Sequence, residues 1–252
     1  MLEPLENVRL SGLLPTVTVA KPEQIIPTCA ALIAGGLNVV EITLRSDAAL
    51  DAIELARRQF PDLTVGAGTI LSAGQAEQAR ERGAQFFVTP GCNPAVLRYF
   101  SQTSLPFVPG CATGGEIEQC RDHGFYVVKI FPVEQLGGLA FLKALAGPYS
   151  DVRFVPLGGV SLATLGQYLA YPKVFACGGS WVAKSELIQQ GDFAAIERNT
   201  REALSAVFRL ALAPMRDGEK VLTLRSQDLE RLDYYLTRRG VAPDQPVRFV
   251  GA

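Results

Sequence analysis

The chain has 252 residues, 48% of them hydrophobic and 19% charged, and a net charge of −1. This balance excludes a broad basic surface for nucleic acid, and no apolar run reaches the roughly 18 residues that a membrane-spanning helix needs, so neither partner is expected. Residues 1–6 lack the basic and apolar regions of a secretory signal, and the five cysteines form no C-x-x-C pair, which together favour a cytoplasmic location.

Strand-like and helix-like segments alternate along the first 212 residues. The apolar runs that predict strands are 13–19, 39–44, 64–70, 86–90, 106–111, 127–131, 153–156 and 174–177. Apolar stripes of helical period lie between them, and a long last helix is expected from its N-cap Asp192 to about residue 212. This alternation favours an α/β fold, a (β/α)₈ TIM barrel. A doubly wound open sheet is the main alternative, but no G-x-G-x-x-G follows the first strand.

Residues 213–252 read as a separate, short extension. A strand-like run at 221–224, a helix-like segment at 227–239 closed by Gly240, and a strand-like run at 247–250 indicate a small β-α-β unit. The unit is too short for a core of its own, so we expect it to pack on the barrel of residues 1–212 or on a neighbouring subunit. Its role is not indicated by the sequence.

One lysine, Lys129, stands in the apolar strand 127–131. Burial of a lysine favours its neutral amine, which is the nucleophile that forms a Schiff base with a ketone. The alternative is a lysine at a strand end whose ammonium reaches water. A zinc site built from several histidines is excluded because His123 is the only histidine, and we expect no metal and no cofactor.

Other polar residues and glycines gather at the ends of the predicted strands, where barrel enzymes place their active sites. Glu41, Thr43 and Arg45 recur at period two and therefore share one face of the second strand. Gly158-Gly159 and Gly179-Ser180 follow the last two strands, where backbone N–H groups and a short helix after Ser180 would suit an anion. The alternatives are a structural ion pair between Glu41 and Arg45 and glycines that serve turn geometry alone.

Seven motifs in order resemble the bacterial 2-keto-3-deoxy-6-phosphogluconate / 4-hydroxy-2-oxoglutarate (KDPG/KHG) aldolase family. They are Val40-Glu41-Ile42-Thr43-Leu44-Arg45, Gly66-Ala67-Gly68-Thr69, Thr89-Pro90-Gly91, Pro109-Gly110-Cys111, Lys129-Ile130-Phe131-Pro132, Gly158-Gly159-Val160 and Gly178-Gly179-Ser180-Trp181. The resemblance spans about residues 8–190. It implies a metal-independent class I aldolase on a (β/α)₈ barrel, a homotrimer, acting in the Entner–Doudoroff pathway of carbohydrate metabolism.

The resemblance also implies roles for individual residues. Lys129 would form the Schiff base, and Glu41 would shuttle protons. The keto acid would be bound by Arg45, Thr69, Phe131 and Pro90, and a phosphate by Gly158, Gly159, Gly179 and Ser180. The implied reaction is cleavage of KDPG to pyruvate and glyceraldehyde 3-phosphate.

Two departures concern the far end of the substrate. Leu157 stands where gluconate-type members usually have threonine, and residues 109–113 look like galactonate-type relatives. The alternatives are therefore an aldolase for 4-hydroxy-2-oxoglutarate or 2-keto-3-deoxy-6-phosphogalactonate. Outside the aldolases, a non-covalent phosphate-binding isomerase or synthase and a catalytically silent sugar-acid-binding barrel are the competing interpretations.

Overall fold

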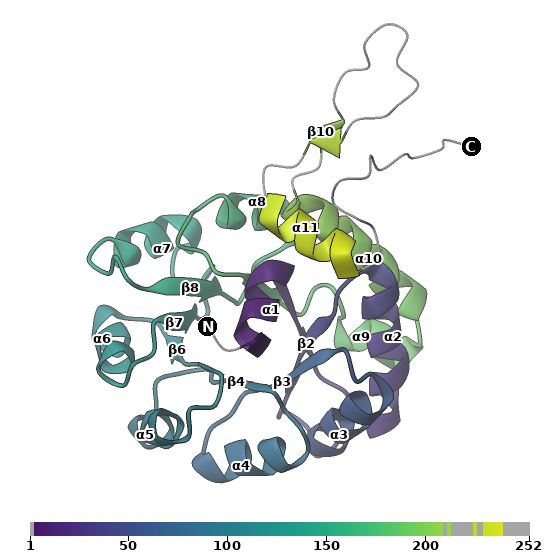
Figure 1. Cartoon of the computed structure of the whole chain (residues 1–252), viewed down its shortest axis with the longest axis horizontal. Helices are drawn as coiled ribbons and strands as arrows, with labels where there is room; N and C mark the ends of the chain where they lie inside the picture. The colour runs from purple at the N-terminus through teal and green to yellow at the C-terminus, as the bar shows by residue number, and fades with distance from the viewer. Residues whose placement is uncertain (1–2, 209–210, 213–223, 226–228, 239–252) are drawn as a thin grey trace, which may run out of the picture.

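The computed structural model describes residues 3–208, 211–212, 224–225 and 229–238, and its strands alternate with helices as expected (Figure 1). The strands are β1 Leu13–Val17, β2 Val39–Thr43, β3 Thr64–Gly68, β4 Phe86–Val88, β5 Phe107–Val108, β6 Gly110–Cys111, β7 Val127–Ile130, β8 Arg153–Pro156 and β9 Cys177–Gly179. The helices are α1 Glu3–Ser11, α2 Ile25–Gly35, α3 Ala49–Gln59, α4 Ala73–Glu81, α5 Pro94–Thr103, α6 Gly114–Asp122, α7 Gly138–Ala146, α8 Leu162–Leu169, α9 Ser185–Gln190, α10 Phe193–Val207 and α11 Leu229–Arg238, with a short 3₁₀ turn η1 Pro22–Gln24.

The nine strands from β1 to β9 are parallel and curl within a ring of helices (Figure 1). Six strands pair in the order β5-β4-β3-β2-β1-β9, and three pair in the order β6-β7-β8. The expected fifth strand is split at Pro109, between β5 and β6, and proline lacks the N–H that a continuous ladder needs. A single parallel bridge, Phe154↔Val174, links β8 to the segment that leads into β9. The α/β class with parallel strands is thus confirmed.

Most strand-like runs in the sequence correspond to observed strands, with changes at their ends. The run expected at 174–177 is shifted, because β9 begins only at Cys177 and Val174 makes just the isolated bridge. The last long helix begins after Asp192, whose side chain caps it as expected, but α10 ends at Val207 rather than near residue 212. The helix α1 was not predicted at all.

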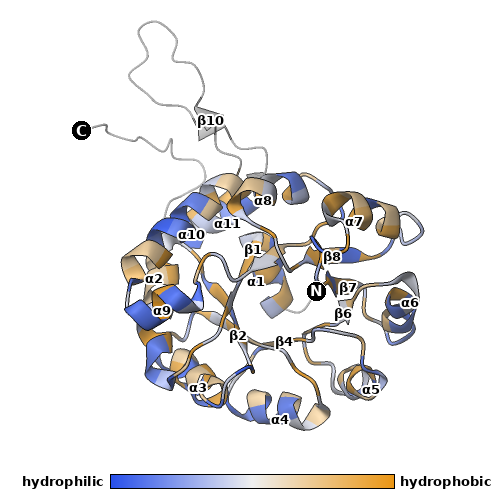
Figure 2. Cartoon of the chain, turned by 180° about the vertical axis from the view of Figure 1, so that it is seen from behind, coloured by the Kyte–Doolittle hydropathy of each residue, from blue (hydrophilic) through white to orange (hydrophobic). Residues whose placement is uncertain are grey.

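The core lies between the strands and the inner faces of the helices. All five residues of β2 and of β3 are buried, and Figure 2 shows apolar colouring on the strands and on helix faces. The sequence predicts an apolar stripe of Ile25, Cys29, Leu32 and Ile33 on α2. The first three are buried, whereas Ile33 is 38% exposed and lies outside the buried face. No helix in the described part of the chain is long and apolar enough to span a membrane.

The helix expected in the extension is confirmed as α11, and it lies against α1 (Figure 1). Two-residue strands β10 Ala211–Leu212 and β11 Leu224–Arg225 pair with each other antiparallel, whereas the strand expected at 247–250 lies outside the described residues. Of the expected strand at 221–224, only Leu224 falls in a described strand.

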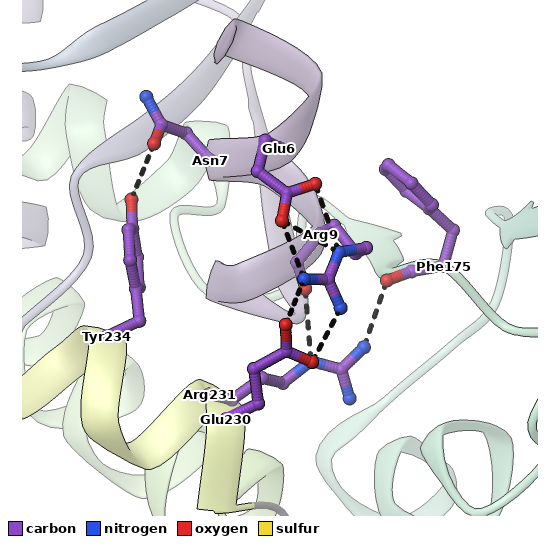
Figure 3. Close-up of polar contacts among 7 residues, drawn as sticks. All are labelled: Glu6, Asn7, Arg9, Phe175, Glu230, Arg231 and Tyr234. Atoms are coloured by element: carbon purple, nitrogen blue, oxygen red, sulfur yellow. Dashed lines mark hydrogen bonds and ion pairs between the residues drawn. The ribbon is translucent and has the colours of Figure 1, made fainter. Parts of the chain in front are cut away.

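Polar contacts hold α11 and α1 together at the edge where the parallel strands begin, here called the amino edge (Figure 3). Arg231 is 7% exposed. Its Nε donates to the Arg9 carbonyl and its Nη2 donates to the Phe175 carbonyl, each at a distance of 3.0 Å. Arg9 also pairs with the Glu230 carboxylate at 2.9 Å, and the Tyr234 hydroxyl donates to Asn7 Oδ1 at 3.0 Å. Helix α11 therefore packs on the preceding elements through paired polar groups as well as apolar contact.

Candidate active site

A cavity of about 390 Å³ lies at the opposite edge, where the parallel strands end, here called the carboxyl edge. Residues within β1, β2, β7 and β9, and residues that follow β1, β2, β7, β8 and β9, line it. They are Thr16, Thr18, Glu41, Thr43, Arg45, Lys129, Phe131, Leu157, Gly158, Gly159, Val160, Ser161, Gly179, Ser180 and Trp181. Ligands in parallel α/β folds bind at this edge because the loops that follow the strands converge there.

The two ionisable groups at the base of the cavity are both buried. Glu41 on β2 is 1% exposed and Lys129 on β7 is 3% exposed. Burial raises the pKa of the Glu41 carboxyl, although the positive charges of Lys129 and Arg45 oppose this shift. Burial likewise lowers the pKa of the Lys129 ammonium, with Arg45 acting in the same direction and Glu41 opposing it. Both shifts favour the neutral forms of the two groups.

Unpartnered polar atoms mark this cavity. Within the described residues, three buried side-chain nitrogen or oxygen atoms have no hydrogen-bond partner, namely both carboxylate oxygens of Glu41 and the indole nitrogen of Trp181. Both residues line the cavity. Because buried polar atoms are nearly always paired in folded proteins, this concentration indicates that the partners come from a bound ligand or water.

The Glu41 carboxylate occupies a space that a glycine on the neighbouring strand leaves open. A β-carbon at Gly68 would lie 1.9 Å from Glu41 Oε1, a distance that no side chain tolerates. The sequence Gly66-Ala67-Gly68 therefore does more than end a strand, because its second glycine makes room for the acid.

The rest of the face formed by β2 carries further polar groups. Arg45 Nε donates to the Thr69 hydroxyl at 3.3 Å, and Thr69 has a left-handed backbone with a φ of 61°. The Thr43 hydroxyl lies 2.7 Å from the Thr18 hydroxyl across the β1–β2 pair. A guanidinium and several hydroxyls thus share the cavity with Glu41 and Lys129, which suits a small anionic ligand.

Phe131 adds an aromatic wall beside the lysine. Lys129 Nζ lies 4.9 Å from the centre of the Phe131 ring, and the Phe131-Pro132 peptide bond is cis. The ring restricts the approach of water to the amine on this side.

The turn after β8 is built from two glycines with left-handed backbones. Gly158 and Gly159 have φ values of 88° and 92°, and a β-carbon on them would lie 2.8 Å from the Pro132 Cα and 2.6 Å from the Glu134 Cβ. Only glycine combines these conformations with this packing. The turn therefore brings its backbone to the cavity wall without side chains in between.

The short helix expected after Ser180 begins further along the chain than a helix dipole at Ser180 would require. The short helix α9 begins at Ser185, five residues further along the chain, so Gly179 lines the cavity from the end of β9 and Ser180 from the loop that follows it. Leu157 also lines the cavity and is only 5% exposed. Its side chain covers the inner side of Gly178, where a β-carbon would lie 2.3 Å from Leu157 Cδ1.

Most of the residues singled out in the sequence meet in this cavity. The lining includes Glu41, Arg45, Lys129, Phe131, Gly158, Gly159, Gly179 and Ser180. Thr69 joins through its bond to Arg45, whereas Pro90 is not among the lining residues and instead lies with its backbone against Gly110.

Sequence reasoning missed several lining residues, chiefly Thr16, Thr18, Ser161 and Trp181. Thr16 is the register partner of Glu41, so the period-two rule applied to the first strand would have found Thr16 and Thr18. Trp181 stands in the motif Gly178-Gly179-Ser180-Trp181 but was given no role there, because its position depends on the loop after β9.

No metal cluster is evident in the part of the chain that the structure describes, where no group of three or more His, Cys, Asp or Glu side chains is arranged to hold an ion. His123 is the C-cap of α6, is partly exposed, and contacts the carbonyl of Gln119 at 2.9 Å. All five cysteines are free thiols.

Comparisons with known proteins agree with this geometry. A family model described as KDPG and KHG aldolase matches residues 5–199. A 2-dehydro-3-deoxy-phosphogluconate aldolase from Treponema pallidum is 44% identical over 207 residues, which is 82% of this chain and 97% of that protein.

Solved structures with the same arrangement include two aldolases. A KDPG aldolase from Legionella pneumophila, solved with pyruvate captured at low pH as a covalent carbinolamine, superposes with a TM-score of 0.77 at 32% identity, covering 80% of this chain and 98% of that one. The 2-keto-3-deoxy-6-phosphogluconate aldolase of Zymomonas mobilis with 3-phosphoglycerate gives 0.75 at 35% identity, covering 81% and 95%.

Proposed function

The chain belongs to the KDPG and KHG aldolase family, and from this premise we propose that it is a class I aldolase that cleaves KDPG to pyruvate and glyceraldehyde 3-phosphate. The observation that carries the proposal is the buried Lys129 in one cavity with a buried Glu41 whose two carboxylate oxygens have no protein partner. A neutral amine beside an unpartnered acid is the pair that Schiff-base chemistry requires.

Imine formation comes first. The neutral amine of Lys129 attacks the C2 ketone, and protonated Glu41 donates a proton to the ketone oxygen, which gives a carbinolamine. Glu41 then moves a proton from the attacking nitrogen to that oxygen, and water leaves as the iminium forms. The raised pKa of Glu41 supplies the acid, and the lowered pKa of Lys129 supplies the nucleophile.

Carbon–carbon cleavage follows on the iminium, which accepts electrons. The Glu41 carboxylate takes the proton of the C4 hydroxyl, the C3–C4 bond breaks, and its electron pair becomes the enamine while C4 leaves as the aldehyde. Protonated Glu41 then gives a proton to C3, and hydrolysis of the resulting iminium frees pyruvate and the neutral Lys129 amine while the Glu41 carboxylate takes up the proton that this hydrolysis releases. Each proton that Glu41 takes is thereby returned.

Arg45 and the glycine turns would hold the two ends of the substrate. The Arg45 guanidinium, fixed by its bond to Thr69, would bind the carboxylate next to the ketone. The backbone of Gly158 and Gly159, with Gly179 and Ser180 opposite, would surround the distal phosphate. The relative from Zymomonas mobilis, solved with 3-phosphoglycerate, supports a phosphorylated ligand.

Membership of the family also supports a closed barrel and a homotrimeric assembly. We propose that the six-stranded and three-stranded pieces form one closed (β/α)₈ barrel, since β5 and β6 are separated by Pro109 alone and the Phe154↔Val174 bridge lies at the other junction. The homotrimer and the cytoplasmic location stay predictions, and gel filtration with light scattering tests the first.

A second substrate is favoured by one observation. Leu157 places an apolar side chain on the cavity wall beside the glycine turn, where a hydroxyl would serve a phosphate better. This feature favours an unphosphorylated keto acid such as 4-hydroxy-2-oxoglutarate. Comparing kcat/KM for KDPG, its dephosphorylated form and 4-hydroxy-2-oxoglutarate decides between these substrates, and the highest value identifies the preferred one.

Reductive trapping tests the chemistry directly. Borohydride added with pyruvate reduces the imine, and peptide mass mapping should find the adduct on Lys129. Lys143 and Lys173 are internal controls, because Lys143 lies over the Tyr171 ring and Lys173 Nζ donates to two carbonyls at 2.7 Å. An adduct on either control, or none at all, would contradict the proposal.

A further inference from the structure

We infer, on the premise of the proposed function, that Glu134 is a positioning residue for the phosphate end of the substrate. Glu134 follows β7 and is not among the cavity-lining residues, so it does not touch the reacting atoms. It acts through the Gly158-Gly159 turn, which it holds in place together with Tyr168 from α8.

The first contact is between backbones. Beyond the ends of β7 and β8, the chain continues to pair, with Val133 N–H donating to the Leu157 carbonyl at 2.7 Å and Glu134 N–H donating to the Gly158 carbonyl at 3.0 Å. The segment that carries Glu134 thus extends the ladder along the glycine turn. The carbonyl of Gly158 is thereby directed toward β7.

The second contact is the Glu134 stem on the turn. A β-carbon at Gly159 would lie 2.6 Å from both Cβ and Cγ of Glu134, so these carbons lie directly against the glycine. Two successive left-handed residues form a flexible segment in the absence of packing, because glycine has the largest conformational freedom of any residue. The Glu134 stem removes that freedom on one side of the turn.

The third contact fixes the carboxylate itself. Tyr168 donates its hydroxyl to Glu134 Oε1 at 2.7 Å, and the Tyr168 side chain is 1% exposed. Burial and the nearby Glu134 charge raise the pKa of Tyr168, so the hydroxyl stays a donor. Tyr168 lies on α8, whose N-cap Ser161 ends the same turn. The turn is therefore held at both its β7 side and its α8 side.

Removal of this support should loosen the turn without altering Lys129 or Glu41. In Glu134→Ala, we expect KM for KDPG to rise about five- to twentyfold, as for the loss of one or two anion contacts, with kcat within about twofold. KM for dephosphorylated KDPG should stay unchanged, and so should borohydride trapping of pyruvate on Lys129. Glu134→Gln keeps the stem and an acceptor and should be close to wild type, whereas Tyr168→Phe should show a smaller shift of the same kind.

The matched control is another Tyr–Glu pair, Tyr149 and Glu118, joined at 3.2 Å and not among the residues that line the cavity. Glu118→Ala and Tyr149→Phe should leave the preference for the phosphorylated substrate intact. Equal losses with both substrates in Glu134→Ala, a fall in kcat alone, or no change would overturn the inference. A wild type without any preference for the phosphorylated substrate would also overturn the positioning role of Glu134. The proposed function is tested separately, and it fails if wild type does not trap pyruvate on Lys129.

Discussion

The two edges of the curled sheet differ in whether their buried ionisable side chains have hydrogen-bond partners. At the amino edge, the buried Arg231 donates to the carbonyls of Arg9 and Phe175, and its neighbours Arg9 and Glu230 pair with each other. At the carboxyl edge, Glu41 is even less exposed, yet neither of its oxygens has a partner.

The difference teaches what each edge contributes. Unpaired buried polar groups reduce stability, so a fold retains them where a ligand completes their bonding. At the amino edge, by contrast, the polar groups of Arg9, Glu230 and Arg231 are paired within the protein and fix α11 against α1. The comparison predicts two separate effects. Changes at the carboxyl edge should affect turnover, and changes at the amino edge should affect the free energy of unfolding.

Lys129 should give the largest effect. Lys129→Ala should reduce kcat/KM for KDPG by more than about 10⁴-fold, because no other lysine among the described residues lines the cavity. Lys129→Arg should fail equally, since a guanidinium stays protonated and forms no imine. Stopped assays of pyruvate release measure both. If a variant without the lysine keeps more than a tenth of wild-type activity, catalysis does not depend on Lys129 and the contrast between the two edges is contradicted.

Glu41 should come next. Glu41→Gln should fold and bind pyruvate but lose about 10²–10⁴ in rate, as expected for a positioned acid and base. Exchange of solvent deuterium into the pyruvate methyl group should fall in parallel, as followed by proton NMR. Near-normal exchange in this variant would assign the proton transfer to another group.

The same variant has a pH signature. Where the Glu41 carboxyl is ionised, its charge raises the pKa of Lys129, so removal of the carboxyl should lower that pKa further below the ordinary 10.5. The ascending limb of pyruvate trapping, which follows deprotonation of the amine, should therefore move to lower pH. Borohydride trapping over a pH series measures the shift, and a limb that moves to higher pH would have the wrong sign.

Arg231 should change stability and leave turnover intact. Arg231→Gln should reduce the free energy of unfolding by about 1–3 kcal/mol, because buried carbonyls lose a charged donor. Arg201→Gln is a control, since its ion pair with Glu197 is exposed and should matter by about 0.5 kcal/mol or less. Denaturant unfolding and kcat on one preparation are the measurements. Loss of kcat without loss of stability would place function at the amino edge too.

Leu157 should give the smallest effect. Leu157→Thr adds one donor beside the glycine turn and should improve the preference for phosphorylated substrate by about 0.5–1.5 kcal/mol, mainly through KM. Steady-state kinetics with KDPG and its dephosphorylated form measure it. If wild type already prefers the unphosphorylated acid, Leu157 marks a different substrate and the phosphosugar interpretation is lost.

Much of the carboxyl edge was predictable because strand periodicity is local. Glu41, Thr43 and Arg45 alternate along one strand, and their shared face follows from that alternation alone. The positions of Trp181 and Pro90 depend instead on how loops from different strands meet, which no local pattern encodes. The same reason explains why α9 was expected too close to Ser180.

The amino edge was less predictable for a related reason. The sequence indicated a helix in the extension but not its partner, because the contacts between Arg231 and the carbonyls of Arg9 and Phe175 join residues far apart in the chain. The helix α1 was missed. It is short and interrupted by the charged side chains of Glu3, Glu6 and Arg9, so its apolar pattern is weak, and its contacts with β2, β3 and α11 decide its structure.

The contact of α1 with α11 also joins the first and last helices of the described chain. A molecule pulled by its two ends would therefore carry the load first on this pair of helices, through Arg9, Glu230 and Tyr234. The parallel strands and the residues that line the cavity would bear force only after the contact between α1 and α11 had ruptured. In an optical trap, the first extension step should release α11 while the enzyme still turns over.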